Sequence, residues 1–109
     1  MLELWQTEWC PASRRVRERL TELGVDYVTR QVPVERESRS ALRAAAGTDS
    51  IPALLHEDGS AVVGEGAIGS WLDDHFTEPA EAAAHRLKAA KAHRRYLEEE
   101  CTCSQPATH

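Results

Sequence analysis

Apolar and polar residues follow regular spacings along most of the chain, beginning with a short strand and a helix. Leu2–Trp5 alternates in the way of a half-buried strand and leads into the loop Gln6–Trp9. Over Pro11–Leu23 the apolar residues recur at spacings of four and three, which predicts a helix. Pro11 suits its first turn and Gly24 supplies its stop, so both ends carry a local signal.

The next segments predict a second strand and a second helix. Val25–Val32 is rich in β-branched and aromatic residues and ends at Pro33, which is typical of a strand. Glu35–Ala46 consists mostly of helix formers, and its one large apolar residue is Leu42. We therefore expect a strand–helix–strand unit followed by a helix that lies shallowly on the sheet.

A β-hairpin and a third helix are predicted next. Ile51–His56 and Ala61–Val63 flank the turn signal Asp58-Gly59, and we expect Pro52 at the beginning of its strand. Gly64–Gly66 leads into a helix that ends before Pro79. The apolar residues of this helix are spaced for one buried face and are Ile68, Trp71, Leu72 and Phe76.

The remaining residues predict one long helix and a tail. Residues 79–100 hold many Ala, Glu, Lys and Arg and few breakers, whereas residues 101–109 show no periodicity. We expect one α/β domain over residues 1–77, a C-terminal helix over 78–100 that packs on it or extends from it, and a mobile tail over 101–109. The predicted order is βαβ, then αββα, then this additional helix.

Composition narrows the class of protein. With 109 residues, 41% of them hydrophobic and 28% charged, the chain suits one soluble domain. A net charge of -5 argues against broad binding to nucleic acid or anionic lipid. No apolar run has the length of a bilayer span, the N-terminus has no signal-like stretch, and three cysteines make no disulfide framework. We expect a cytoplasmic protein, either a monomer or a weak homodimer, without nucleic-acid or membrane partners.

Cys10 is the candidate nucleophile because it precedes the first predicted helix. Backbone N–H groups and the positive end of the helix dipole favour a thiolate there. Pro11 removes a donor that has no helical partner, Arg14 and Arg15 add positive charge one turn away, and Glu8 opposes the effect if it lies close. The alternative is that Cys10 is a small buried apolar residue without reactivity.

Three segments carry a resemblance to a known family. They are Trp9–Ser13 after the first strand, the pair Ile51-Pro52, and Gly64–Ile68 at the start of the third helix. Together they resemble the glutaredoxins and the N-terminal domains of glutathione S-transferases, from Leu2 to about Phe76. The resemblance implies a thioredoxin-like fold of the glutaredoxin type and a low-molecular-weight thiol, such as glutathione, as cosubstrate.

The resemblance also implies how a thiol peptide is bound beside the nucleophile. Pro52 is expected to be cis and to face Cys10, which leaves the backbone of Ile51 free to pair with the cysteinyl part of the ligand. The alternative is an ordinary trans proline on an edge strand.

The resemblance implies that the γ-glutamyl end of the ligand binds at the start of the third predicted helix. Glu65 matches the family's acidic residue, whereas Gly66 replaces its serine. Backbone N–H groups of Gly66 and Ala67 are suited to a carboxylate, and Glu65 is suited to the amino group. The alternative is that Glu65 only caps its helix.

Two departures from the family define the expected reaction. Thr7 stands where glutaredoxins usually carry lysine, so Arg14 or Arg39 is expected to substitute. Ser13 replaces the second cysteine of a dithiol motif, so Cys10 has no internal disulfide partner there and Ser13 is a candidate hydrogen-bond donor to the thiolate. We expect a monothiol oxidoreductase that reduces mixed disulfides of proteins with glutathione or another small thiol.

Other interpretations stay open. The Cys101–Cys103 pair is a resolving pair for Cys10, half of a metal site, or a pair in a mobile tail, and we favour the last. His85 and His93 share one helix face, but no metal is expected. An alternative function is that of an iron–sulfur cluster carrier. The glycine-rich loop that such proteins carry after the cysteine is absent, because Pro11 and Ala12 occupy its place. A second alternative is a non-catalytic binding module.

Overall fold

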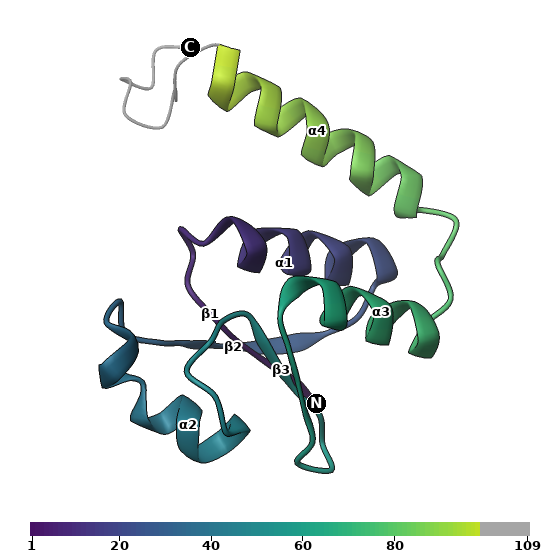
Figure 1. Cartoon of the computed structure of the whole chain (residues 1–109). Helices are drawn as coiled ribbons and strands as arrows, with labels where there is room; N and C mark the ends of the chain where they lie inside the picture. Colours follow the sequence, from purple (N-terminus) through teal and green to yellow (C-terminus); the bar gives the residue numbers. More distant parts are fainter. Residues whose placement is uncertain (99–109) are drawn as a thin grey trace.

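The computed structural model describes residues 1–98, with side chains to residue 94. Strands and helices alternate around one four-stranded sheet (Figure 1). In chain order the elements are β1 Leu2–Gln6, α1 Pro11–Leu23, β2 Tyr27–Gln31, the 3₁₀ turn η1 Arg36–Ser38, α2 Ser40–Ala46, β3 Ala53–Leu55, β4 Ala61–Val63, α3 Glu65–His75 and α4 Ala82–Glu98.

The sheet has the strand order β2-β1-β3-β4. β1 pairs in parallel with β2 and antiparallel with β3, so Leu4 lies between Thr29 and Leu54. Helices α1 and α3 cover one face of the sheet and α2 lies on the other (Figure 1). This is a thioredoxin-like α/β fold with an added C-terminal helix, so the predicted fold class and element order are confirmed.

The main core lies between the sheet and the α1–α3 layer. It joins residues of β1, β3, α1 and α3, namely Leu2, Leu4, Val16, Leu20, Leu23, Leu54, Ile68 and Leu72. Each fully buried leucine contributes about 1.5–3 kcal/mol relative to an exposed one. A smaller cluster of Val32, Leu42 and Ala53 under α2 confirms that this helix packs thinly. The large core therefore anchors α1, whose first residue follows Cys10.

The predicted second helix is wrong in its first half. Instead of one helix over Glu35–Ala46, η1 and α2 are separated by Arg39, whose backbone leaves helical geometry with φ -86° and ψ 50°. The Arg39 side chain is buried, and its guanidinium donates hydrogen bonds to three backbone carbonyls, those of Pro33, Val34 and Asp49. These bonds join segments before and after the predicted helix, which a local pattern does not reveal.

Two predicted strands are longer than the observed ones. Val25 belongs to the connection rather than to β2, since its N–H donates to the Leu20 carbonyl behind the left-handed Gly24. Ile51 and Pro52 precede β3 instead of beginning it.

Helix α4 begins at Ala82 rather than at Pro79, and it lies over the outer side of α1 (Figure 1). The predicted end at Glu100 and the Cys101–His109 tail lie outside the described residues. Within residues 1–98, none of the helices has the length and apolarity to cross a membrane. Among the residues of α4 whose side chains are described, Ala82 is fully buried whereas Leu87 is largely exposed.

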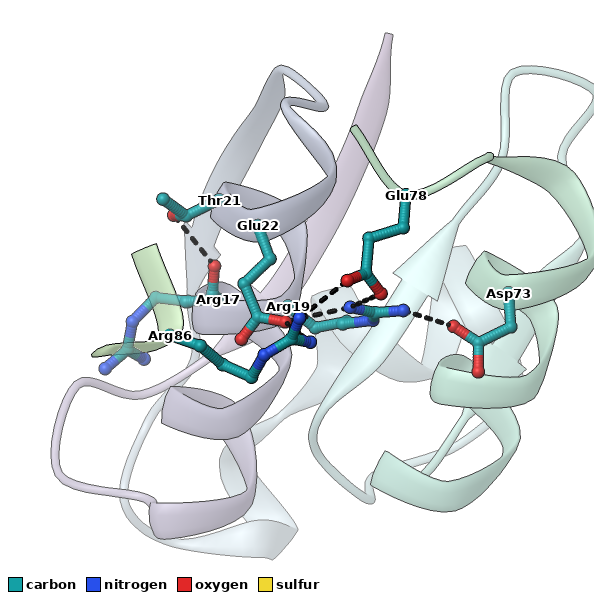
Figure 2. Close-up of polar contacts among 7 residues, drawn as sticks. All are labelled: Arg17, Arg19, Thr21, Glu22, Asp73, Glu78 and Arg86. Atoms are coloured by element: carbon teal, nitrogen blue, oxygen red, sulfur yellow. Dashed lines mark hydrogen bonds and ion pairs between the residues drawn. The ribbon is translucent and has the colours of Figure 1, made fainter. Parts of the chain in front are cut away.

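Charged side chains, which we call the α1–α4 charge cluster, link α1 to α3 and α4 (Figure 2). The cluster consists of Arg19, Glu22, Asp73, Glu78 and Arg86. Arg19 contacts Glu22 at 2.8 Å, Asp73 at 3.0 Å and Glu78 at 3.2 Å, and Arg86 contacts Glu78 at 2.6 Å and Glu22 at 3.3 Å. These contacts raise the pKa of Arg19, above all its hydrogen bond to Asp73, although desolvation opposes the shift.

Candidate functional site

Cys10 is the N-cap residue of α1, as the sequence predicts. Its backbone is extended, with φ -76° and ψ 117°, and its sulfur accepts a hydrogen bond from the Ser13 N–H at 3.4 Å. The Cys10 N–H donates to the Thr7 carbonyl at 3.4 Å, which closes the turn between β1 and α1. Cys10 therefore lies half-buried at the end of a helix that the main core holds in place.

Arg17 ties the loop before Cys10 to the helix after it. Its guanidinium donates to the buried Gln6 side chain and, at 3.4 Å each, to the carbonyls of Thr7 and Glu8. Because Arg17 lies on α1, these hydrogen bonds join the segments on both sides of Cys10.

The surroundings of the Cys10 sulfur favour the thiolate. Partial burial raises the pKa of Cys10, but hydrogen bonds from the Ser13 side chain and from the backbone of Ser13 and Ala12, together with the charge of Arg15, outweigh it. The pKa of Cys10 is thus lowered from its ordinary value, in the predicted direction. Of the two predicted cations, Arg15 contributes, whereas Arg14 is exposed and lies 3.8 Å from Glu18.

The Ser13 side chain is fully buried beside this sulfur. Apart from the Cys10 sulfur, its Oγ has no hydrogen-bond partner among the described residues, and the buried Thr7 Oγ1 has none there. A buried hydroxyl without a partner costs stability, so such groups call for an explanation. For Ser13, the explanation lies at the adjacent sulfur, since a rotation of its O–H toward Cys10 gives it an acceptor.

An open cavity of about 250 Å³ adjoins Cys10. It is lined by Trp9, Cys10, Arg36, Arg39, Ser50 and Ile51. The Ile51-Pro52 peptide bond is cis, as the resemblance implies, and Ile51 shares the cavity with Cys10. Sequence reasoning did not identify Arg36 or Ser50, which hydrogen-bond each other at 3.0 Å, because η1 and the loop before β3 meet only in the folded chain.

Glu65 lies on the first turn of α3, and its carboxylate forms an ion pair with Arg15. The Arg15 guanidinium donates to both carboxylate oxygens, with Nη2 2.9 Å from Oε1, and this lowers the pKa of Glu65. The alternative that Glu65 caps its helix is wrong, since Gly64 is the N-cap and no side-chain cap bond is present. Gly66 and Ala67 follow in the first turn, where backbone N–H groups have no helical acceptor.

The predicted site residues thus fall into two neighbouring groups. Cys10 and Ile51 share one cavity, whereas Arg15 and Glu65 line a groove of about 180 Å³ between α1 and α3. Arg15 connects the groups, because its charge acts on Cys10 while its side chain is bonded to Glu65. The Arg15–Glu65 contact was missed from the sequence because no local spacing signals it.

No group of three or more His, Cys, Asp or Glu side chains suited to a metal ion is present in the described part of the chain. His93 lies 2.8 Å from Glu18 of α1, so it takes part in the contact between α4 and α1. The Cys101–Cys103 pair lies outside the described residues.

Comparisons with known proteins agree with this fold. The family model of the glutathione S-transferase N-terminal domain matches residues 4–80. Among solved structures, a glutathione S-transferase domain-containing protein from Marinobacter aquaeolei is 26% identical with a TM-score of 0.60, and the match covers 83% of this chain and 49% of that one. No curated protein matches the chain.

Two further solved structures contain glutathione. A glutathione transferase family member from Pseudomonas fluorescens with bound glutathione is 20% identical, with a TM-score of 0.65 and coverage of 93% of this chain and 58% of that one. A glutaredoxin–glutathione complex from buckwheat is 21% identical, with a TM-score of 0.54 and coverage of 68% and 69%. The chain spans about half the length of the transferases that it matches, 45% and 49% in two of them.

Proposed function

Since the chain belongs to the family of glutathione S-transferase N-terminal domains, we propose that it is a monothiol oxidoreductase that reduces mixed disulfides with glutathione or another low-molecular-weight thiol. The observation that carries this proposal is the Cys10 sulfur, which has a lowered pKa and opens onto a cavity shared with Ile51. The glutathione bound in two solved relatives supports a small thiol as cosubstrate.

The candidate residues bind different parts of the small thiol. The backbone of Ile51 pairs with the cysteinyl part of the ligand, whose sulfur then lies toward Cys10. The Arg15–Glu65 pair suits a zwitterionic γ-glutamyl end, with Arg15 facing its carboxylate and Glu65 its ammonium group. The backbone N–H groups of Gly66 and Ala67 add donors for the same carboxylate.

The reaction proceeds in two thiol–disulfide exchanges. The Cys10 thiolate attacks the small-thiol sulfur of a protein mixed disulfide, a new disulfide forms at Cys10, and the protein thiolate leaves and takes up a proton. A second small thiol, as its thiolate, then attacks this disulfide, which releases the low-molecular-weight disulfide and regenerates the Cys10 thiolate. Ser13 has no thiol that could resolve the disulfide at Cys10, so the second exchange uses a thiol from solution. Ser13 and Pro11 shape the helix start at which the thiolate is held.

The test is reduction of a glutathionylated peptide in the presence of glutathione, coupled to glutathione reductase and followed by NADPH consumption. We expect Cys10→Ser to lower the rate to background, whereas the Cys101→Ser/Cys103→Ser double variant retains it. Unchanged turnover in Cys10→Ser, or a wild-type rate equal to the uncatalysed one, contradicts the proposal.

A further inference from the structure

Arg39 is a buried cation that has no carboxylate partner within 4 Å among the described residues. Only 5% of the residue is exposed, and the Asp49 carboxylate pairs with Arg36 and Arg43 instead. A buried charge without a counterion is costly unless hydrogen bonds satisfy it. The acceptors that its N–H groups bind therefore decide what Arg39 does in the fold.

Each nitrogen of the Arg39 guanidinium donates to a different backbone carbonyl. Nε bonds Pro33 at 2.8 Å and Nη2 bonds Val34 at 3.1 Å, on the segment that follows β2. Nη1 bonds Asp49 at 2.9 Å, two residues before Ile51. A planar guanidinium with donors in fixed directions holds these two segments in one arrangement, which the single ammonium group of a lysine does not do.

Ile51 lies between two bonded carbonyls and itself has no backbone hydrogen bond in the described part of the chain. Before it, Arg39 holds the carbonyl of Asp49, and after it the Gly64 N–H donates to the Pro52 carbonyl at 2.9 Å. Arg39 and Ile51 both line the cavity that adjoins the candidate nucleophile. The position of the free backbone groups of Ile51 in this cavity therefore depends on the arginine.

Arg36 is a second link to the same segment. Its Nη2 lies 2.6 Å from the Asp49 carboxylate and donates to the Ser50 hydroxyl at 3.0 Å. Its side chain is 62% exposed, however, and exposed ion pairs are individually weak. The buried Arg39 is therefore the stronger of the two links.

We propose that Arg39 is a positioning residue, which keeps the backbone of Ile51 in place for the peptide part of the small thiol. The proposal rests on the mixed-disulfide reaction proposed above and adds to it a residue that acts through Ile51. The effect comes from the shape of the guanidinium and not from its charge. Arg39→Lys keeps the charge but loses the three directed donors, so it separates these two causes.

The experiment uses the full chain carrying Cys101→Ser and Cys103→Ser, so that Cys10 is its one thiol. Two substrates share one cysteine-containing peptide, which carries glutathione in the first and 2-mercaptoethanol in the second. Only glutathione has peptide groups with which Ile51 can pair. Transfer of the small thiol to Cys10 in a single turnover is followed by rapid quenching and mass spectrometry. The ratio of the two second-order rate constants measures the contribution of the peptide groups.

Arg43→Lys is the matched control. The Arg43 guanidinium also donates to two backbone carbonyls, those of Arg36 at 3.0 Å and Glu37 at 2.8 Å. It does not line the cavity, and its one link to the segment before Ile51 in the described residues is a 3.9 Å ion pair with the Asp49 side chain. The same substitution there removes similar bonds without releasing the Asp49 carbonyl.

We expect Arg39→Lys to slow transfer of glutathione about tenfold, the scale of one lost hydrogen bond between ligand and protein. Transfer of 2-mercaptoethanol should keep the rate of the parent chain, because it does not use the backbone of Ile51. Arg43→Lys should change neither rate. A role in general stability alone does not alter the ratio of the two rates.

Hydrogen exchange measured by mass spectrometry tests the positioning without any reaction. The amides of residues 48–51 should exchange faster in Arg39→Lys than in the parent chain, because their link to the segment after β2 is lost. In Arg43→Lys their exchange should match that of the parent chain.

Three outcomes overturn the proposal: a ratio in Arg39→Lys equal to that of the parent, equal slowing of both transfers, or unchanged exchange of residues 48–51. The first of these assigns any effect of Arg39 to its charge. If the parent chain transfers neither small thiol faster than an uncatalysed thiol does, the mixed-disulfide proposal fails, and hydrogen exchange still decides whether Arg39 holds the segment. If Arg39→Lys does not fold, Arg39→Gln in trimethylamine N-oxide, which favours the folded state, takes its place.

Discussion

Helix α1 carries polar side chains near both of its ends, and the two ends differ in how these side chains are paired. Near the C-terminal end, Arg19 and Glu22 are surrounded by opposite charges from α3, the α3–α4 connection and α4 (Figure 2). Near the N-terminal end, the Cys10 sulfur faces an open cavity and the Ser13 hydroxyl is buried beside it.

The difference separates a structural role from a chemical one. In the α1–α4 charge cluster every described carboxylate meets a guanidinium, so the cluster links α4 to α1. At the Cys10 end, hydrogen bonds from Ser13 and Ala12 and the charge of Arg15 favour the thiolate, and the sulfur opens onto a cavity. The same helix therefore begins at the candidate nucleophile and ends in contacts that hold the chain together, and the following changes test that division.

The largest expected effect comes from the core that supports both ends. Leu20→Ala should lower the free energy of unfolding by about 2–5 kcal/mol, because Leu20 is fully buried between α1 and the sheet. Urea denaturation measures this loss, and Leu87→Ala serves as the control, since Leu87 is 59% exposed and should change little. Equal losses in the two variants would show that α1 is not anchored by this core.

The next largest effect is expected from a change in the α1–α4 charge cluster. Arg19→Met should lower the free energy of unfolding by about 1 kcal/mol, since partly exposed ion pairs are individually weak and the methionine keeps the apolar stem. The pKa of Cys10, measured by the pH dependence of alkylation, should not change. Arg30→Met, which removes a single exposed pair with Glu3, is the control for stability. A shift of the Cys10 pKa in Arg19→Met contradicts the division between the two ends.

A smaller effect is expected from the cation at the reactive end. Arg15→Met should raise the pKa of Cys10 and slow its alkylation at neutral pH, because the charge of Arg15 favours the thiolate. Arg14→Met is the matched control on the adjacent position, where the guanidinium faces Glu18. If both variants shift the pKa equally, the effect is one of general charge and not of the Arg15 position.

The smallest expected effect is a pH dependence of stability. Since the folded state lowers the pKa of Cys10, this residue stabilises the fold fully above the unfolded thiol pKa of about 8.5 and loses that contribution as pH falls through the folded pKa. The difference in unfolding free energy between wild type and Cys10→Ser should therefore grow with pH across this window. A difference that stays flat, or shrinks, is inconsistent with a stabilised thiolate.

Much of the fold follows from signals that act within a few residues. The bounds of α1 were predicted correctly because Pro11 and the left-handed Gly24 mark its ends and apolar residues mark one face between them. The position of Cys10 at the helix start, and the direction of its pKa shift, follow from the same local geometry.

Contacts between distant segments could not be predicted from the sequence pattern. Glu35–Ala46 has the composition of a single helix, but Arg39 bonds the carbonyls of Val34 and Asp49 and interrupts it. Glu65 was identified as a ligand residue, yet its Arg15 partner was not, because the two meet only when α3 packs beside α1.

The amino-acid sequence by itself thus determined the order of strands and helices and the place of Cys10 at the start of α1, because these depend on the periodicity, caps and breakers of short segments. The tertiary structure alone decided that Arg36 lines the cavity beside this cysteine and that Glu65 holds Arg15, whereas Ile51 and Ser13 were already expected there. These neighbours depend on packing between elements far apart in the chain, and hydrogen bonding and burial act only once that packing is in place.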